Sequence, residues 1–271
     1  MQPSETPVVI LAGGKGMRLR EYTEFMPKGL VPIGSIPVLL HVMKIYAHQG
    51  FRRFILCLGY KGDMIKKYLT GQNWLTDGMQ LEAGGPMHEI KNFTKELGDF
   101  DVTFVDTGLD TETGGRIKKV EKYIKGDNFF ANYCDGLCDV DLKELLSFHL
   151  NKGKVATVTG VSPMSQFGIL EVEDGLAVSF KEKPKLPGLI NGGYFVFNKR
   201  IFDYLDEDSV LEQEPLRRLA SEKQLTAFTH KGFWQCMDTY KDFERLNKLW
   251  ETGNLPHFDL NYAKPPWKIW D

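Results

Sequence analysis

Apolar runs alternate with helical patterns through the first half of the chain. Segments rich in apolar residues at 8–11, 54–58, 101–105 and 129–133 predict strands. Between them, apolar residues recur at helical spacing over 37–48, 62–69 and 115–123. Pro37 suits the first turn of one helix, and Gly50 suits its C-terminal end. This alternation predicts an α/β fold with an open, mostly parallel sheet flanked by helices on both faces.

The second half of the chain has a different pattern. Strand-like segments at 155–161, 168–172, 177–181 and 193–197 follow one another without helices between them, so we expect the sheet to become mixed there. Helical patterns return at 211–221 and 238–252, and a Pro-rich tail follows. The segment 71–99 has little periodicity and several glycines, which predicts an extended loop or a hairpin.

A glycine-rich turn follows the first predicted strand. Residues 11–19 are LAGGKGMRL, and Pro27 and Lys28 come shortly after. Glycines let the backbone approach a ligand closely and present its N–H groups to an anion. Arg18 can fork onto phosphate oxygens, and Lys28 adds a compact point charge. The loop therefore predicts a polyphosphate pocket, with a glycine turn that binds no ligand as the alternative.

Two common nucleotide-binding loops are excluded by this sequence. A P-loop requires Lys and then Ser or Thr after its last glycine, whereas Met17 follows Gly16 here. A dinucleotide fingerprint requires a third glycine where Leu19 stands. It also requires an acidic residue after a second strand about twenty residues on, and residues 28–36 contain none.

Nine ordered motifs resemble the sugar-1-phosphate nucleotidylyltransferases. The glycine loop with its following Pro-Lys is similar to that family's signature. The other matches are DTG at 106–108, TGGR at 113–116, CDG at 134–136, FG at 167–168, EKPK at 182–185, INGG at 190–193, EQEPL at 212–216 and GFWQCMDT at 232–239. The first two of these, EQEPL and the closing PWKIW at 266–270 resemble one branch, the glucose-1-phosphate cytidylyltransferases that make CDP-glucose.

This resemblance implies a Rossmann-like nucleotidyltransferase fold and a reaction. CTP and α-D-glucose 1-phosphate would give CDP-glucose and pyrophosphate, with Mg²⁺ as cofactor. The domain, 1–271, would comprise a nucleotide-binding half at about 7–136, a sugar-phosphate half at about 137–252 and a tail at 253–271. Relatives assemble into multimers, so we expect a homo-oligomer. The alternatives are another nucleotide or sugar phosphate, or a catalytically silent relative that binds nucleotide sugars.

The resemblance also implies a role for individual residues. Nucleotide contacts would come from Leu11, Ala12, Gly13, Gly14, Gly16, Met17, Arg18, Lys28, Thr111, Arg116 and Cys134. The sugar phosphate would meet Glu182, Lys183, Asn191, Gly192, Gly193 and Trp234, and the metal would meet Asp135 and Asp238. Arg18, Lys28 and Lys183 would be catalytic through their charge.

Asp135 and Asp238, the two residues expected to bind the metal, each have a competing structural interpretation. Transfer between two anionic phosphates requires charge screening, which favours carboxylates that hold a divalent cation. Asp135 follows a predicted strand, at the edge where open sheets bind ligands, but Asp-Gly is also a common turn pair. Asp238 precedes a helical pattern, where an aspartate would equally serve as the N-cap.

The other assignments have structural alternatives as well. The Glu182–Lys183 cluster would be a solvated charged face, and the Asn-Gly-Gly run at 191–193 would be a β-bulge or a tight turn. Arg116 would be a surface cation on a helix, and Trp234 would pack in the core. Met17 is a departure, because family members usually have Thr or Ser there and a thioether cannot donate a hydrogen bond to phosphate.

Composition limits the kinds of binding partner and the cellular compartment that we expect for this protein. A net charge of −2 gives no reason to expect nucleic acid or a membrane as a partner. The four cysteines form no C-x-x-C pair and no Cys/His metal spacing, and Cys57 lies in an apolar run. The N-terminus does not resemble a signal peptide, and no apolar run approaches the roughly 18 residues of a membrane span. We therefore expect a cytoplasmic protein.

Overall fold

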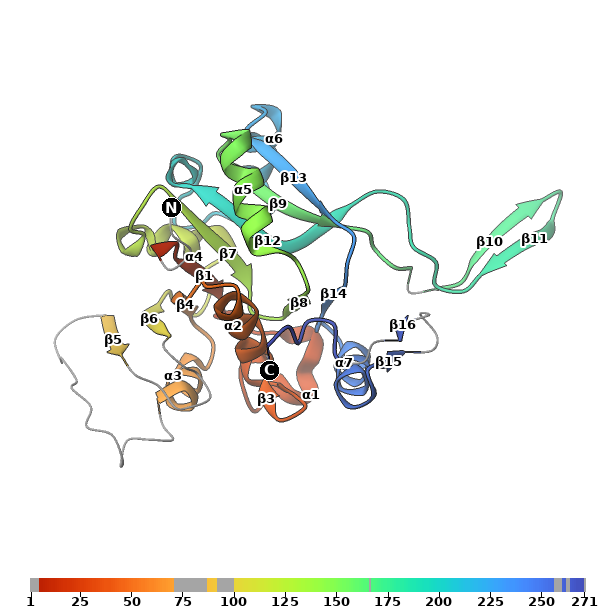
Figure 1. Ribbon diagram of the computed structural model, residues 1–271, viewed down its shortest axis with the longest axis horizontal. Coiled ribbons are helices and arrows are strands. Elements are labelled where there is room, and N and C mark those ends of the chain that lie inside the picture. Colours follow the sequence, from red (N-terminus) through yellow and green to blue (C-terminus); the bar gives the residue numbers. More distant parts are fainter. Residues whose placement is uncertain are drawn as a thin grey trace.

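A mixed sheet of eight strands forms the centre of the molecule in the computed structural model, which describes residues 5–70, 87–91, 100–165, 167–255, 260–261 and 264–270 (Figure 1). The strand order is β13-β9-β12-β7-β1-β4-β6-β5. These strands span Leu225–His230, Ala156–Val161, Ile190–Asn198, Asn128–Tyr133, Val8–Leu11, Arg53–Leu58, Asp101–Asp106 and Met87–Lys91. β12 and β5 run antiparallel to their neighbours and the other strands run in one direction, which confirms the open, mostly parallel sheet.

Helices cover both faces of this sheet. The apolar residues of β1 alternate between the two faces, so that Val8 and Ile10 belong to one core and Val9 and Leu11 to the other. The first core also contains residues of α2 (Val38–His48), α3 (Gly62–Thr70), α5 (Leu142–Lys152) and α7 (Tyr240–Thr252). The second contains residues of α4 (Thr113–Lys119) and α6 (Glu214–Ser221).

Both parts of the chain that were expected to bind different substrates contribute to the same sheet. Strands β7, β1, β4, β6 and β5 come from the first part, and β13, β9 and β12 come from the second. The two parts meet where β12 pairs with β7. A ligand at the ends of these strands is therefore within reach of both parts.

Shorter elements complete the described structure. They are η2 (Met17–Leu19), α1 (Arg20–Thr23), η3 (Lys28–Leu30), β2 (Pro32–Ile33), β3 (Ile36–Pro37), η4 (Glu121–Tyr123), β8 (Gly136–Cys138), η5 (Lys199–Tyr204), β14 (Trp234–Cys236), β15 (Asn254–Leu255) and β16 (Leu260–Asn261). β8 pairs with β14, and the sequence patterns predicted neither β8, β13 nor α5. In α5 the signals were present, because Asp141 is its N-cap and Gly153 adopts a left-handed C-cap.

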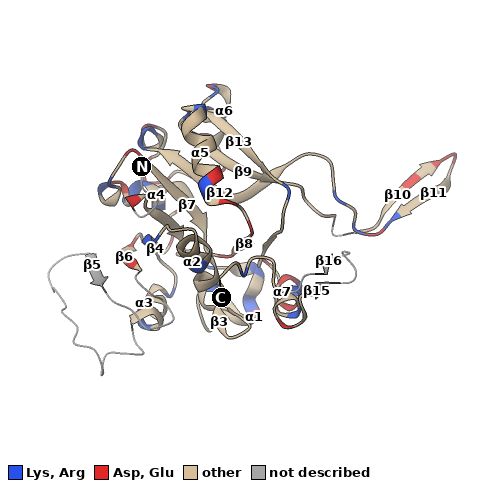
Figure 2. Cartoon of the chain, viewed as in Figure 1, with Lys and Arg blue, Asp and Glu red and all other residues tan. Residues whose placement is uncertain are grey.

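Strands β10 (Ile169–Glu173) and β11 (Leu176–Lys181) form a separate antiparallel hairpin that projects from the body, and we call this hairpin the arm (Figure 1). The expectation that these two segments join the mixed sheet is wrong. Leu170 pairs with Phe180 and Val172 lies two residues beyond Leu170 on β10, so these three apolar side chains share one face. A register shift between Glu171 and Val172 interrupts the alternation along β11. These side chains are exposed, and charged residues also stand on both strands (Figure 2).

The tail docks on its own chain through Trp267. This side chain is completely buried, its indole stacks on Phe233, and its N–H donates to His41 Nδ1 at 3.2 Å. The predicted loop at 71–99 lies outside the described residues except for β5. No helix in the described part of the chain is long and apolar enough to span a bilayer.

Candidate active site

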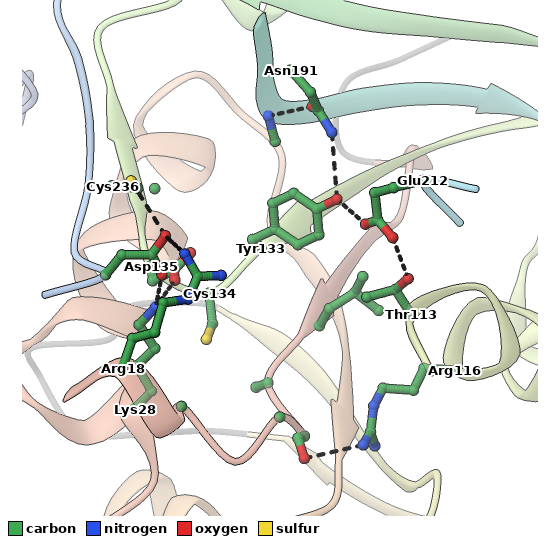
Figure 3. A pocket seen from close by; sticks show the side chains of 18 of the residues that line it. Arg18, Lys28, Thr113, Arg116, Tyr133, Cys134, Asp135, Asn191, Glu212 and Cys236 are labelled. Carbon is green, nitrogen blue, oxygen red and sulfur yellow. Dashed lines mark hydrogen bonds and ion pairs between the residues drawn. The ribbon is translucent and has the colours of Figure 1, made fainter. Parts of the chain in front are cut away.

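A cavity of about 570 Å³ opens beyond the carboxyl ends of β1 and β7 (Figure 3). Parallel strands of an open sheet place ligand sites at this edge. The cavity is lined by Leu11, Ala12, Gly13, Gly14, Gly16, Arg18, Lys28, Thr111, Glu112, Thr113, Arg116, Tyr133, Cys134, Asp135, Gly136, Asn191, Gly192, Gly193, Glu212, Trp234, Cys236 and Asp238. Most of the residues that the sequence predicted for nucleotide, sugar phosphate and metal therefore surround one space.

The glycine loop forms one wall, and its geometry requires glycine. Gly16 has a φ of +61°, and a Cβ there would lie 2.8 Å from Thr23 Cγ2. A Cβ on Gly13 would collide with the guanidinium of Arg116. The carbonyl of Gly13 accepts a hydrogen bond from the Tyr60 N–H at 3.0 Å. The loop is thus fixed in place with its backbone close to the cavity.

Lys28 joins the two predicted metal ligands. Its ammonium group contacts the Asp135 carboxylate and lies 2.5 Å from Asp238 Oδ1. Arg18 Nη1 donates to the other Asp238 oxygen, Oδ2, at 2.9 Å. Asp135 directly precedes β8 and Asp238 follows β14, so the pairing of these strands brings the aspartates together. The Met237 N–H donates to the Asp135 carbonyl at 3.0 Å and fixes this register.

Charge pairing determines the protonation states in this cluster. Burial lowers the pKa of Lys28, but Asp135 and Asp238 outweigh it and hold the pKa above its ordinary value. Burial raises the pKa of Asp238, but Lys28 and Arg18 outweigh it and lower the pKa. Lys28 is therefore a cation and Asp238 an anion at neutral pH. A phosphate or a divalent ion that enters this end of the cavity meets fixed charges.

The competing interpretations of the two aspartates have different outcomes. Thr239, not Asp238, is the N-cap of α7, because its hydroxyl accepts from the Asp242 N–H at 3.2 Å and Asp242 accepts from the Thr239 N–H at 2.9 Å. The N-cap interpretation of Asp238 is therefore wrong, and its carboxylate turns to the cavity. Asp135 lies in a turn and also lines the cavity, so its two interpretations are compatible.

Arg116 is buried, so the interpretation as a surface cation is wrong. Its guanidinium donates to Thr107 Oγ1 at 2.7 Å and to the carbonyls of Gly108 at 2.8 Å, Gly13 at 3.1 Å and Leu58 at 3.3 Å. These acceptors belong to the glycine loop, the end of β4 and the turn after β6. Arg116 lines the cavity beside the glycine loop and holds three of the surrounding segments together.

The opposite wall is built around a β-bulge in β12. The register with β9 shifts between Asn191 and Phe195, and Gly193 has a φ of +79° that places its backbone against the Tyr133 ring. The Trp234 indole N–H donates to the Gly192 carbonyl at 2.7 Å. The bulge and the predicted sugar-binding residues are thus the same feature, and Trp234 both packs and lines the cavity.

Tyr133 and Glu212 form a polar pair in the cavity that the sequence analysis did not select. The Tyr133 hydroxyl donates to the Glu212 carboxylate, and the Thr113 hydroxyl donates to the same carboxylate at 2.7 Å (Figure 3). Burial and then Glu212 raise the pKa of Tyr133 above its ordinary value. The position of Tyr133 at the end of β7, next to Cys134 and Asp135, was the available signal. Burial raises the pKa of Cys134 to about 12, so its thiol is neutral.

Three predicted site residues do not line the cavity. Met17 is 61% exposed. Glu182 and Lys183 directly follow β11 at the base of the arm, where the Lys183 ammonium lies 2.6 Å from the Glu182 carboxylate. Lys183 also has a φ of +46°, which is unusual for a residue with a side chain. No contact of this pair with the cavity is seen in the described part of the chain.

Comparisons with known proteins place the chain among nucleotidyl transferases. The family model described as nucleotidyl transferase matches residues 7–252. The chain is 42% identical to a probable glucose-1-phosphate cytidylyltransferase of Bacillus subtilis, over 97% of this chain and 99% of that protein. It is 43% identical to the glucose-1-phosphate cytidylyltransferase of Salmonella typhi, with the same coverage. The crystal structure of HddC from Yersinia pseudotuberculosis matches 90% of this chain and 98% of that one, with a TM-score of 0.65 and 26% identity.

Proposed function

The chain belongs to the nucleotidyl transferase family, and from that premise we propose that it transfers a cytidylyl group from CTP to α-D-glucose 1-phosphate. The products are CDP-glucose and pyrophosphate. The observation that carries the proposal is the convergence of Lys28, Asp135 and Asp238 in a cavity whose other wall is the glycine loop. The choice of CTP and glucose 1-phosphate rests on the two relatives of 42% and 43% identity.

The reaction joins two anions, so positioning and charge stabilisation supply most of the rate. A phosphate oxygen of the sugar phosphate attacks the α-phosphorus of CTP. The new O–P bond forms as the bond from that phosphorus to the pyrophosphate oxygen breaks. In this proposal Arg18 and Lys28 neutralise charge on the triphosphate, and backbone N–H groups of the glycine loop orient it. Arg116 acts as a positioning residue, because it holds the loop through the Gly13 carbonyl.

We propose that Asp135 and Asp238 hold a Mg²⁺ ion. The residues fit this ion, because two carboxylates converge on one cationic atom, the Lys28 nitrogen. Mg²⁺ is usually bound by one or two protein carboxylates together with phosphate oxygens. When bound, the ion supplies charge neutralisation for the phosphates.

A substrate panel tests the proposed reaction. Purified protein with Mg²⁺ should release pyrophosphate with CTP and glucose 1-phosphate, and the sugar product should be CDP-glucose. The panel crosses the common nucleoside triphosphates with several sugar 1-phosphates, with the Asp135→Asn variant as the inactive control. Faster release of pyrophosphate with another pair of substrates would show that the enzyme prefers that pair and that the proposed specificity is wrong. No release with any pair would favour the silent nucleotide-sugar binder.

We also propose that the protein is a homo-oligomer in which the arm packs on a second copy. A two-stranded hairpin is only marginally stable by itself, and an exposed apolar face generally marks an interaction surface. Side chains on one face of this hairpin are exposed by 56% at Leu170, 60% at Val172 and 64% at Phe180. The arm also carries Glu182 and Lys183, which stay our predicted sugar-phosphate contacts. A second copy that receives the arm near its cavity would obtain both residues from its neighbour.

Co-expression of two impaired variants tests this arrangement. Asp135→Asn subunits keep a normal arm, and Lys183→Ala subunits keep a normal cavity. If the site is shared, mixed oligomers regain part of the wild-type activity because some sites combine two intact halves. If Lys183 acts within its own chain, mixed oligomers stay as slow as the two parents.

Reducing surroundings such as the cytoplasm remain our prediction for the compartment.

A further inference from the structure

Cys138, Asp139 and His230 come together outside the cavity, and none of them lines it. Cys138 is the last residue of β8, Asp139 follows it, and His230 is the last residue of β13. One potential ligand atom from each side chain lies within 4.8 Å of those of the other two. The chain brings a thiol, a carboxylate and an imidazole to one point although His230 is remote in sequence.

Asp139 Oδ1 is a buried oxygen without a hydrogen-bond partner among the described residues. It lies 2.9 Å from His230 Nε2, but that nitrogen is also within hydrogen-bonding distance, 3.2 Å, of the Phe233 carbonyl. Buried carboxylate oxygens are normally satisfied, and an exception calls for a physical explanation such as a bound ion. A cation between the Asp139 oxygen and the His230 nitrogen would give both atoms a partner.

The backbone leaves room for such a cation. A Cβ on Gly232 would collide with Asp139 Oδ1 and would lie 2.8 Å from His230 Cε1, so the turn after β13 admits these side chains only because residue 232 is glycine. Asp139 also lines a surface cleft of about 340 Å³ together with His48, Gln49, Val140, Asp141, Lys143 and Ile269. Asp139 is thus the member of the cluster that borders a cleft.

We propose that Cys138, Asp139 and His230 bind a Zn²⁺ ion. Zn²⁺ takes thiolate sulfur, imidazole nitrogen and carboxylate oxygen as ligands, and four-coordinate sites with these atoms are common. A tetrahedral ion spaces its ligand atoms about 3.5 Å apart, so the carboxylate and the imidazole move slightly apart around it. Binding converts the Cys138 thiol into a thiolate and releases its proton to solvent.

The site would join parts of the molecule that support catalysis. Cys138 pairs with Trp234 at one end of the β8–β14 ladder, and Asp135 and Asp238 both lie beyond its other end, where Gly136 pairs with Cys236. A metal that ties β8 to the end of β13 would therefore stiffen the frame of the two aspartates. This inference does not depend on which nucleotide or sugar phosphate the enzyme uses.

Cobalt substitution tests the thiolate ligand directly. Chelator-treated full-length protein is titrated with Co²⁺, and the absorbance of a thiolate-to-cobalt charge-transfer band is followed. We expect one such site per chain, a band that Zn²⁺ abolishes, and loss of the band in Cys138→Ser. The matched control is Cys236→Ser, because Cys236 lies 3.9 Å from Asp238 at the substrate cavity. A band that disappears in Cys236→Ser and persists in Cys138→Ser would overturn the proposal, and so would no band at all.

Two further variants avoid the risk that a change at the buried Cys138 prevents folding. His230→Gln and Gly232→Ala should weaken Zn²⁺ binding by at least the roughly 100-fold that loss of a second-shell partner can cause. In thermal unfolding, Zn²⁺ should raise the Tm of the wild-type protein and leave the Tm of these variants nearly unchanged. An equal rise in the wild type and both variants would place the ion elsewhere and refute the site.

Discussion

Two groups of charged residues that the sequence predicted for one reaction lie in different surroundings. The cavity group contains Lys28, Asp135 and Asp238, whose side chains are 12%, 16% and 29% exposed. The arm group contains Glu182 and Lys183, whose side chains are 52% and 22% exposed. Residues far apart in sequence hold the cavity group in place, whereas the members of the arm group are neighbours on a projecting segment.

The two groups differ in what fixes the positions of their side chains. The paired strands β8 and β14 fix the cavity group within one chain, and opposite charges stabilise it there. In the proposed oligomer, the geometry of the arm group would depend on where the exposed hairpin packs, because the described residues of one chain leave its apolar side chains exposed. Substitutions in the two groups should therefore differ in size and in kind.

The largest effect is expected in the cavity group. Asp135→Asn and Asp238→Asn should each lower kcat by about 100-fold or more, which corresponds to roughly 3 kcal/mol of transition-state stabilisation. The physical reason is loss of a carboxylate that holds the proposed metal. Asp242→Asn is a matched control, because Asp242 caps α7 without lining the cavity. Pyrophosphate release measures the rates, and near wild-type kcat in either variant would remove that aspartate from the site.

The two lysines separate the groups by substrate. Lys28→Ala should raise the KM for CTP, and Lys183→Ala should mainly impair use of the sugar phosphate. A hydrogen bond to a charged group contributes about 1.5–3 kcal/mol, so each effect on kcat/KM should be roughly 10- to 150-fold. Lys181→Ala is the control on the arm, because its ammonium pairs with Glu171 at 2.8 Å. Steady-state kinetics in which both variants impair both substrates equally would show that the assignment is wrong.

Acid should destabilise the body, because a buried histidine holds the tail. Burial lowers the pKa of His41 to about 4, and its Nδ1 must stay unprotonated to accept from Trp267. The unfolded chain binds this proton at higher pH, so the free energy of unfolding is complete above about pH 6.5. It should fall by roughly 3 kcal/mol as the pH drops towards 4.

Urea unfolding at several pH values measures this loss. His41→Gln should remove part of the acid dependence, and the exposed His48→Gln serves as the control. Burial also lowers the pKa of His149 to about 4, so the variant should keep a remaining slope of the same sign. If the acid dependence of the free energy of unfolding is unchanged in His41→Gln, protonation of His41 is not what weakens the docking of the tail in acid.

Local patterns were sufficient for much of the fold and for part of the site. Strands such as Val8–Leu11 and Arg53–Leu58 are apolar enough to be recognised, and the end of a strand pointed to Asp135. Partners distant in sequence were not recognisable. Spacing does not pair Tyr133 with Glu212, and it does not bring His230 to a cysteine, because sheet topology decides both.

The arm and the helix starts show a second limit. The alternating pattern of Leu176–Lys181 predicts a strand correctly, but it contains no information on whether that strand joins the main sheet. Asp238 and Thr239 are both good N-cap residues, so the sequence alone does not decide where α7 starts. In the structure the Asp238 carboxylate pairs with Lys28, and Thr239 is the N-cap.

The smallest effect is expected at Met17, next to the cavity group. Its side chain is 61% exposed and does not line the cavity, so replacement by Thr leaves no cavity in a packed core. Gly16 and Arg18 keep the loop in the cavity wall on either side. A Thr hydroxyl that reaches a CTP phosphate would add a hydrogen bond of about 0.5–1.5 kcal/mol, so Met17→Thr should lower the KM for CTP about two- to tenfold. Met17→Ala is the control, because it shortens the side chain without a donor and should leave the KM unchanged. A higher KM in Met17→Thr would mean that the methionine itself contributes to CTP binding, and the cavity group would then extend beyond the residues that line it.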